Sequence, residues 1–227
     1  MFKREHHRRI HGLLKSLNGS LLEQAQCYFG GGTAIVLLLG EYRESLDVDF
    51  LCESTEGYRT LRNTIYNDGL SALFQSDIEQ LRETRTDQYG IRTVLNVEGV
   101  PIKFEIIKEG RISLAGAINT SLGVPVLTRT DMYVETLLAN TDRGADVATL
   151  SRDIIDLSMM ISEWGEIPEA AWSKAQSAYG DSVKRAFVQA FNRISDADYL
   201  QSCARKMAME PLFVAKVQRV VSDHLRF

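Results

Sequence analysis

A glycine triplet followed closely by an Asp-x-Asp pair constrains this chain more than any other feature. Both lie in the run YFGGGTAIVLLLGEYRESLDVDF, residues 28–50. Glycines at 30–32 let the backbone turn sharply and approach a ligand, because no Cβ blocks the contact. The apolar residues 33–39 predict a buried helix, whose first N–H groups and positive dipole end suit a phosphate. Thr33 is expected in the first turn, with its hydroxyl available to backbone or phosphate.

Residues 46–51 alternate between polar and apolar side chains, which predicts a half-buried strand. Alternate residues of a strand share a face, so Asp47 and Asp49 should project together with Cα atoms about 7 Å apart. Two carboxylates this close repel each other unless a cation lies between them. Their oxygens suit Mg²⁺ or Mn²⁺, and two such ions about 4 Å apart can assist an in-line displacement at phosphorus. We therefore predict a site for a nucleoside triphosphate (NTP) and two metal ions.

A third carboxylate is expected on a neighbouring strand. Residues 100–107 alternate, so that three apolar side chains share one face and Glu105 shares the other with Lys103. Glu105 is our candidate to complete a three-carboxylate site. The alternative is an exposed strand residue that forms an ion pair with Lys103 or Lys108.

The order of the patterns predicts an α+β fold. A nucleotide-binding core of mixed sheet and flanking helices occupies residues 1–125, and an all-helical half occupies residues 126–227. We expect the boundary near residues 123–127, where a Gly/Pro-containing segment separates the mixed pattern from the helical one. In the first half the pattern predicts helices at 3–17 and 58–74 and strands at 79–86 and 91–97. In the second it predicts helices at 129–142, 149–163, 167–179, 181–193, 196–207 and 210–225.

Five motifs together resemble a known superfamily. They are GGGTA at 30–34, RESLDVDF at 43–50, IKFEI at 102–106, DMYVETLLANTDR at 131–143 and RDIIDL at 152–157. They resemble the nucleotidyltransferases with a DNA-polymerase-β-like core. More closely, the chain is similar to the AbiEii/AbiGii-type nucleotidyltransferase toxins of bacterial toxin–antitoxin and phage-abortive systems.

The resemblance implies roles for particular residues. Asp47 and Asp49 would bind metal, with Glu105 as the third acidic residue. Asp153 or Asp156 would lie near the nucleotide or support the site. The nucleotide itself would be contacted by Gly31, Gly32, Thr33, Arg43, Ser45 and Arg152.

One position departs from the family pattern. The helix that begins near Asp131 usually carries a lysine where this chain has Thr136. A lysine there could neutralise phosphate charge. Arg129, Arg143 and Arg152 are candidates to supply that charge instead.

The leading hypothesis is an enzyme that moves a nucleoside monophosphate from an NTP to an acceptor hydroxyl with Mg²⁺. The resemblance implies a tRNA 3′ end as one candidate acceptor and an antitoxin as partner. Two alternatives stay open: a catalytically weakened nucleotide-binding or interaction protein, and a transferase that modifies a small molecule.

Composition and charge restrict the class of protein and its expected cellular environment. The net charge of −4 argues against nonspecific coating of nucleic acid, although a local basic groove remains compatible with it. Three cysteines form no paired spacing, as expected of reduced thiols. No apolar run approaches the roughly 20 residues of a membrane span, so we expect a soluble, cytoplasmic protein.

Overall fold

The computed structural model describes residues 2–224 and divides into two compact units. The first contains the chain up to Ala34 together with Leu46–Thr128. The second contains Ile35–Ser45 together with the chain from Arg129 onward. The predicted α+β class is confirmed, since the first unit holds the sheet and the second is helical. The predicted division into 1–125 and 126–227 stays a prediction.

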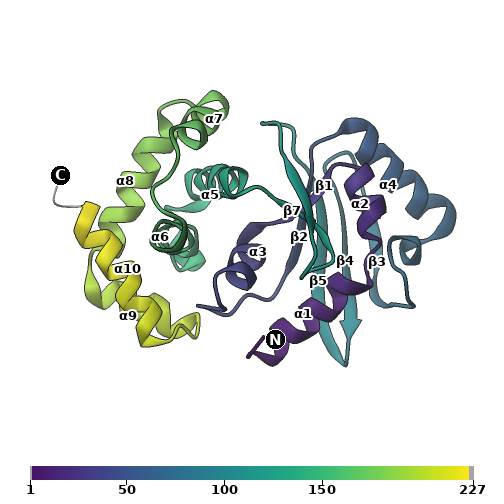
Figure 1. Cartoon of the computed structure of the whole chain (residues 1–227), viewed down its shortest axis with the longest axis horizontal. Helices are drawn as coiled ribbons and strands as arrows, with labels where there is room; N and C mark the ends of the chain where they lie inside the picture. The colour runs from purple at the N-terminus through teal and green to yellow at the C-terminus, as the bar shows by residue number, and fades with distance from the viewer. Residues whose placement is uncertain (1, 225–227) are drawn as a thin grey trace. The chain divides into compact units, whose positions relative to one another are not determined.

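The first unit is built on one mixed seven-stranded sheet with the order β3-β4-β5-β2-β1-β7-β6 (Figure 1). The β2–β5 and β1–β7 pairs are parallel and the other pairs are antiparallel. Its strands are β1 (Cys27–Gly30), β2 (Val48–Cys52), β3 (Glu79–Thr86), β4 (Gly90–Val97), β5 (Val100–Lys108), β6 (Gly116–Asn119) and β7 (Val124–Leu127). The order places β2 and β5, which carry the predicted carboxylates, side by side near the middle.

One face of this sheet forms the core of the first unit. Side chains on β5 alternate as the sequence predicts: Ile102, Phe104 and Ile106 are fully buried, while Glu105 is only partly covered. The helices α1 (Glu5–Ser16), α2 (Gly19–Gln24) and α4 (Thr55–Asp68) pack against the sheet, and the short helix η1 (Leu70–Leu73) packs against α4. The ring of Phe74 packs against that of Phe104 in a tilted arrangement, with the centroids 5.9 Å apart. The opposite face of β5 is therefore left for polar side chains.

Residues 123–127, where the sequence places the domain boundary, also hold a strand that the sequence did not predict. Those residues include β7, a strand between β1 and β6 in the sheet. Every side chain of β7 is buried, so it lacks the alternation by which a half-exposed strand is recognised. Pro125 made a strand harder to predict from the sequence, because proline has no backbone N–H to donate to a neighbouring strand.

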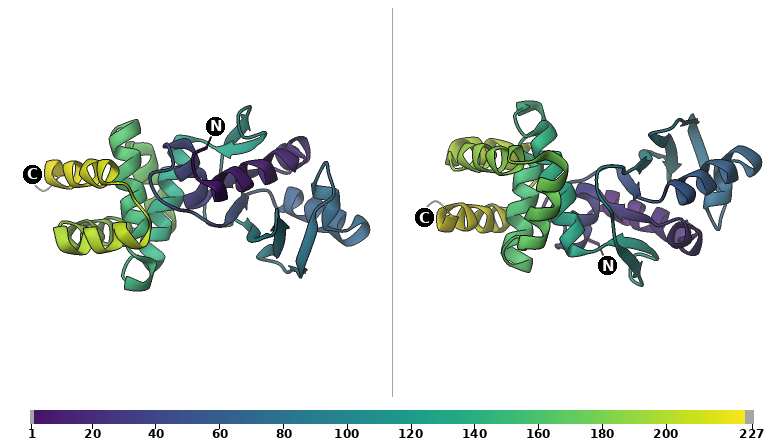
Figure 2. Two further views of the ribbon diagram at one scale, coloured as in Figure 1. Left: turned by 90° about the horizontal axis from the view of Figure 1, so that it is seen from below. Right: turned by 90° about the horizontal axis from the view of Figure 1, so that it is seen from above.

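The second unit is a helical bundle, and all six helices expected after residue 128 are confirmed. They are α5 (Arg129–Arg143), α6 (Arg152–Trp164), α7 (Glu169–Tyr179), α8 (Ser182–Ile194), α9 (Ala197–Lys206) and α10 (Pro211–His224), with a short η2 (Val147–Thr149) before α6. In both views of Figure 2 these helices, coloured teal to yellow, lie together as a bundle. Helix α5 packs against α6, α7 and α8, and α10 packs along α6.

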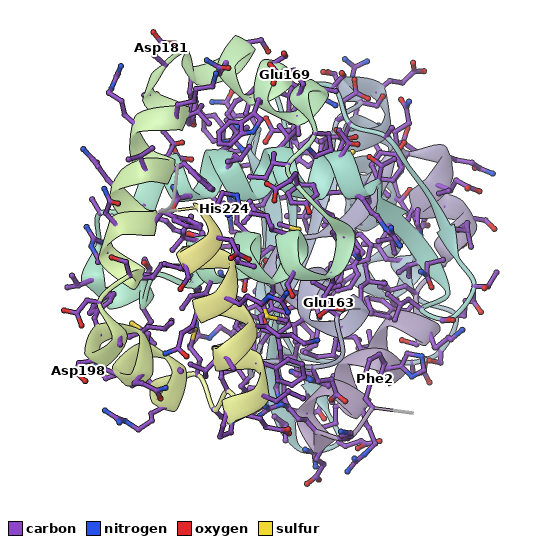
Figure 3. All side chains as sticks on the ribbon, turned by 60° about the vertical axis from the view of Figure 1, so that its left-hand side comes forward. Phe2, Glu163, Glu169, Asp181, Asp198 and His224 are labelled. Atoms are coloured by element: carbon purple, nitrogen blue, oxygen red, sulfur yellow. The ribbon has the colours of Figure 1, made fainter. Side chains whose placement is uncertain are left out.

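Polar pairs join the outer helices of this bundle. Lys216 on α10 forms an ion pair with Glu163 on α6 at 2.5 Å. His224, at the end of α10, lies 3.0 Å from the Glu166 carboxylate. Figure 3 labels Glu163 and His224 and shows them on these two helices. Within the described residues, no helix combines the length and the apolar character needed to cross a membrane.

Candidate active site

The glycine triplet is a direct junction between strand and helix. Strand β1 ends at Gly30, and α3 (Gly31–Leu38) begins at the next residue. Gly31 has φ +66°, a left-handed conformation that side-chain-bearing residues rarely adopt. A Cβ on Gly31 would lie 3.3 Å from Oδ2 of Asp49. Glycine therefore suits the backbone conformation at this position, and a Cβ there would come into tight contact with the Asp49 carboxylate.

Asp49 and Glu105 are direct neighbours across the sheet. Asp49 pairs with Gly30 of β1 on one side and with Glu105 of β5 on the other. Paired residues on adjacent strands, about 4.8 Å apart, present their side chains on the same face. The structure thus brings two of the three predicted carboxylates together beside the start of α3.

Asp47 lies one residue before β2 and is tied to the same helix. The Thr33 hydroxyl donates a hydrogen bond of 2.5 Å to the backbone carbonyl of Asp47. This bond joins the first turn of α3 to the segment that carries the Asp pair. From the sequence, the Thr33 hydroxyl could bond either the backbone or a phosphate. In the structure it bonds the backbone. The contact of Thr33 with the triphosphate stays a prediction.

Glu105 is held by two cations. Lys103 Nζ lies 2.5 Å from one carboxylate oxygen of Glu105, and Arg92 Nε lies 3.3 Å from the other. Burial tends to lower the pKa of Lys103, but the hydrogen bond and charge of Glu105, with the charges of Asp47 and Asp49, raise it overall. Lys103 therefore supplies the positive charge that closely spaced carboxylates require. The pairing of Glu105 with Lys103 is the alternative that the sequence left open.

The donor chemistry of this cluster suits a hard divalent cation. Asp47, Asp49 and Glu105 offer only carboxylate oxygens, which Mg²⁺ and Mn²⁺ prefer. Within residues 2–224, however, no three His, Cys, Asp or Glu side chains are arranged to hold a metal ion. The Lys103 side chain beside them is half exposed and has a flexible stem.

A second group of predicted site residues forms a buried network in the helical unit. Arg43 donates two hydrogen bonds of 2.7 Å to the Asp156 carboxylate, one to each oxygen. Tyr42 donates a third bond of 2.6 Å to the same carboxylate. Arg43 and Asp156 are 4% and 1% exposed. Burial opposes the positive charge of Arg43, but Asp156 raises the arginine pKa above its ordinary value.

Asp153 is also held by an arginine. Arg143 Nε and Nη2 donate to its two carboxylate oxygens at 2.8 and 2.7 Å. The neighbouring Arg152 has a buried Nε atom without a hydrogen-bond partner among the described residues. Ser45 ends the segment Ile35–Ser45 of the same unit. The nucleotide contacts assigned to these residues from sequence stay predictions.

The family assignment rests on nearly the whole chain. Residues 13–220 match the family described as nucleotidyl transferase AbiEii toxin, type IV toxin–antitoxin system. The chain belongs to the AbiEii family. It is therefore a nucleotidyltransferase of a toxin family, which implies an NTP substrate and an antitoxin partner.

Similarities outside the family match are more distant. No curated protein matches the chain. Among solved structures, a protein of H. pylori described as a nucleotidyltransferase has a TM-score of 0.49 at 17% identity, over 95% of this chain and 92% of that one. An antigenic nucleotidyltransferase-like protein of Paracoccidioides brasiliensis has a TM-score of 0.41 at 15% identity, over 81% and 94%. JHP933 from Helicobacter pylori has a TM-score of 0.39 at 14% identity, over 88% of this chain and 100% of that one.

Thr136, where the resemblance led us to expect a lysine, is buried. Thr136 is 7% exposed, and its hydroxyl donates a 2.7 Å hydrogen bond to the Met132 carbonyl one turn earlier. Its polar group is thus satisfied within α5. Of the candidate replacements, Arg143 is engaged by Asp153, and Arg129 lies over the ring of Trp164 at 5.2 Å.

Proposed function

We propose that this AbiEii member transfers a nucleoside monophosphate from an NTP to an acceptor hydroxyl, using two Mg²⁺ ions. The acceptor oxygen bonds to the α-phosphorus, the bond from that phosphorus to the β-phosphate oxygen breaks, and pyrophosphate leaves. The observation that supports this most strongly is the row formed by Gly30, Asp49 and Glu105 on three adjacent strands. It places carboxylates where helix α3 begins, so metal-binding and phosphate-binding groups adjoin.

Each residue has a proposed task in this reaction. Asp47, Asp49 and Glu105 would hold the ions, which when bound supply positive charge to the attacking and leaving oxygens. Glu105 is our candidate to take the proton from the acceptor hydroxyl. Gly31, Gly32 and Thr33 would bind the triphosphate at the start of α3.

The residues of the helical unit have supporting tasks in this proposal. Ser45 and Arg152 remain proposed nucleotide contacts. Because Arg43 and Asp156 hold each other, and Arg143 holds Asp153, we propose these pairs as positioning groups. The acceptor that we propose is the 3′ end of a tRNA, as the resemblance drawn from the sequence implies.

Label transfer tests the proposal directly. Purified protein would be incubated with Mg²⁺, total bacterial RNA and protein, and each NTP in turn carrying a radioactive α-phosphate. We expect label in a discrete RNA band with at least one nucleotide. Label in protein, or only in a small-molecule fraction, would contradict the tRNA acceptor but keep the transferase.

A second candidate function follows from Thr136. Without the family lysine, the chain would bind NTP and Mg²⁺ without turnover. In that case Thr136→Lys would restore label transfer that the unmodified protein lacks. We expect instead that the unmodified protein transfers label and that Thr136→Lys gives no gain, because the lysine must enter a buried, hydrogen-bonded position.

Removing the lysine that neutralises the carboxylates should strengthen metal binding. Lys103→Met is expected to bind Mn²⁺ about tenfold more tightly, because no ammonium group then competes for Glu105. Calorimetric titration with Mn²⁺ measures the affinity. Lys108→Met removes the same charge from the same strand and should leave the affinity unchanged. Equal affinities of Lys103→Met and the unmodified protein would show that Lys103 does not compete with metal.

A further inference from the structure

The edge strand β3 carries two arginines on one face because it is bulged. In a regular strand, residues three apart point to opposite faces. Here the pairing with β4 shifts register between Gln80 and Arg82 and again between Arg82 and Arg85. Arg82 pairs with Val94, and Arg85 pairs with Arg92. An extra residue in each shift turns the strand so that both arginines share a face.

This face is the one that carries the proposed catalytic carboxylates. Arg85 pairs with Arg92, Arg92 pairs with Glu105, and Glu105 pairs with Asp49. Directly paired residues of neighbouring strands present side chains on the same face. One row therefore runs from the edge strand β3 through β4 and β5 to β2. On the other face, the intervening core residues are buried under helices.

Arg82 and Arg85 differ from the other cations on this face of the sheet. Arg92 contacts both Glu105 and Asp87, and Lys103 contacts Glu105. Arg82 and Arg85 are exposed, and neither forms a side-chain hydrogen bond or ion pair within residues 2–224. Their guanidinium groups are therefore available for an external anion. Guanidinium forms paired, charge-assisted hydrogen bonds with phosphate oxygens.

Protection of the sheet edge explains only part of this arrangement. Charged residues on an edge strand discourage pairing with another chain, and they do so from either face. The bulges, in contrast, direct both arginines to the face of Asp49 and Glu105. Strand β3 lies two strand spacings from β5, about 10 Å, which corresponds to about three nucleotides at the rise of a stacked strand.

We infer that Arg82 and Arg85 bind backbone phosphates of a single-stranded nucleic acid whose terminal hydroxyl is the acceptor at Glu105. This inference rests on the proposed transferase function and assigns the acceptor-binding surface of the same site. The negative net charge of the chain is compatible with it, because the positive charge is local. Neither arginine takes part in the bond-making step.

Salt-dependent RNA binding tests the inference. The probe is a fluorescein-labelled single-stranded RNA of mixed sequence, followed by fluorescence anisotropy over a range of salt concentrations. The variant Arg82→Gln/Arg85→Gln should lower the slope of log affinity against log salt by about 1.4, because two phosphate contacts are lost. We expect about tenfold weaker binding near physiological salt. Arg82→Lys/Arg85→Lys keeps both charges and should retain most of the slope.

A matched control removes equal charge elsewhere in the same unit. Arg59→Gln/Arg62→Gln changes two exposed arginines of α4 and should leave the RNA slope unchanged. Equal losses in both double variants, or no RNA binding by the unmodified protein, would overturn the inference. The inference would also be overturned if Arg82→Gln/Arg85→Gln lost binding to poly-glutamate while its RNA binding stayed intact. An acidic protein would then be the partner of this surface.

The surface and the transferase can fail separately. RNA binding that depends on Arg82 and Arg85, without label transfer by the unmodified protein, would contradict the transferase and keep the surface. Label transfer with an unchanged KM for RNA in Arg82→Gln/Arg85→Gln would contradict the surface and keep the transferase. Circular dichroism of each variant confirms that it is folded before either comparison.

Discussion

Asp49→Asn should reduce label transfer about 10³-fold, a loss of about 4 kcal/mol of transition-state stabilisation. Asparagine keeps the size of the side chain but removes the negative charge between Gly30 and Glu105. A neutral amide oxygen holds a divalent cation more weakly than a carboxylate does. Single-turnover transfer from a labelled NTP measures the rate, and Mn²⁺ titration measures the loss of metal binding independently.

An exposed carboxylate of the same unit provides the control for Asp49. Asp68 ends helix α4 on the surface, so Asp68→Asn changes the net charge equally without touching the site. We expect its transfer rate to match that of the unmodified protein. A rate for Asp49→Asn above one tenth of the unmodified rate would rule out the mechanism proposed for this carboxylate.

Arg43→Met should lower the free energy of unfolding by about 3–5 kcal/mol, because it leaves the buried Asp156 carboxylate without its paired charge. The remaining hydrogen bond from Tyr42 cannot replace the two that Arg43 donates. Urea denaturation of the full chain, followed by circular dichroism of its helices, measures the loss. Arg43→Met/Asp156→Leu should recover part of it, since both buried charges are then removed.

A partly exposed ion pair of the same helical unit shows what an ordinary pair contributes. Lys216 and Glu163 are both about a third exposed, so Lys216→Met should cost less than about 1 kcal/mol. If Arg43→Met cost no more than Lys216→Met, the buried network would not stabilise the bundle. The positioning role that we propose for Arg43 and Asp156 would then lose its basis.

Local pattern was sufficient for the elements that carry the chemistry. The strand at residues 79–86 and the alternation of β5 follow from side-chain period, which acts between near neighbours in the chain. The six C-terminal helices follow from apolar spacing in the same way. Strand β7 was missed because a strand buried on both faces has no alternation to recognise.

The sequence could not predict which residues far apart in the chain would contact each other. Arg92 joins Glu105 only because β4 and β5 pair in that register. The ion pair of Arg43 with Asp156 spans 113 positions of the chain. No local pattern reports such partners, since the free energy of an ion pair depends on burial and geometry that the folded chain creates.

The sequence by itself determined the six C-terminal helices and the strands β3, β4 and β5, and it established the Asp pair with Glu105 as candidates on polar strand faces. Only the tertiary structure decided that Asp49 adjoins Glu105 and Gly30, that Lys103 neutralises the carboxylates, and that Arg43 faces Asp156. It also decided that two bulges turn the arginines of β3 toward the carboxylate face. The physical reason is the distance along the chain over which each kind of interaction acts. Side-chain period is a property of adjacent residues, whereas register, bulges and charge partners are determined by the packing of strands and helices against one another.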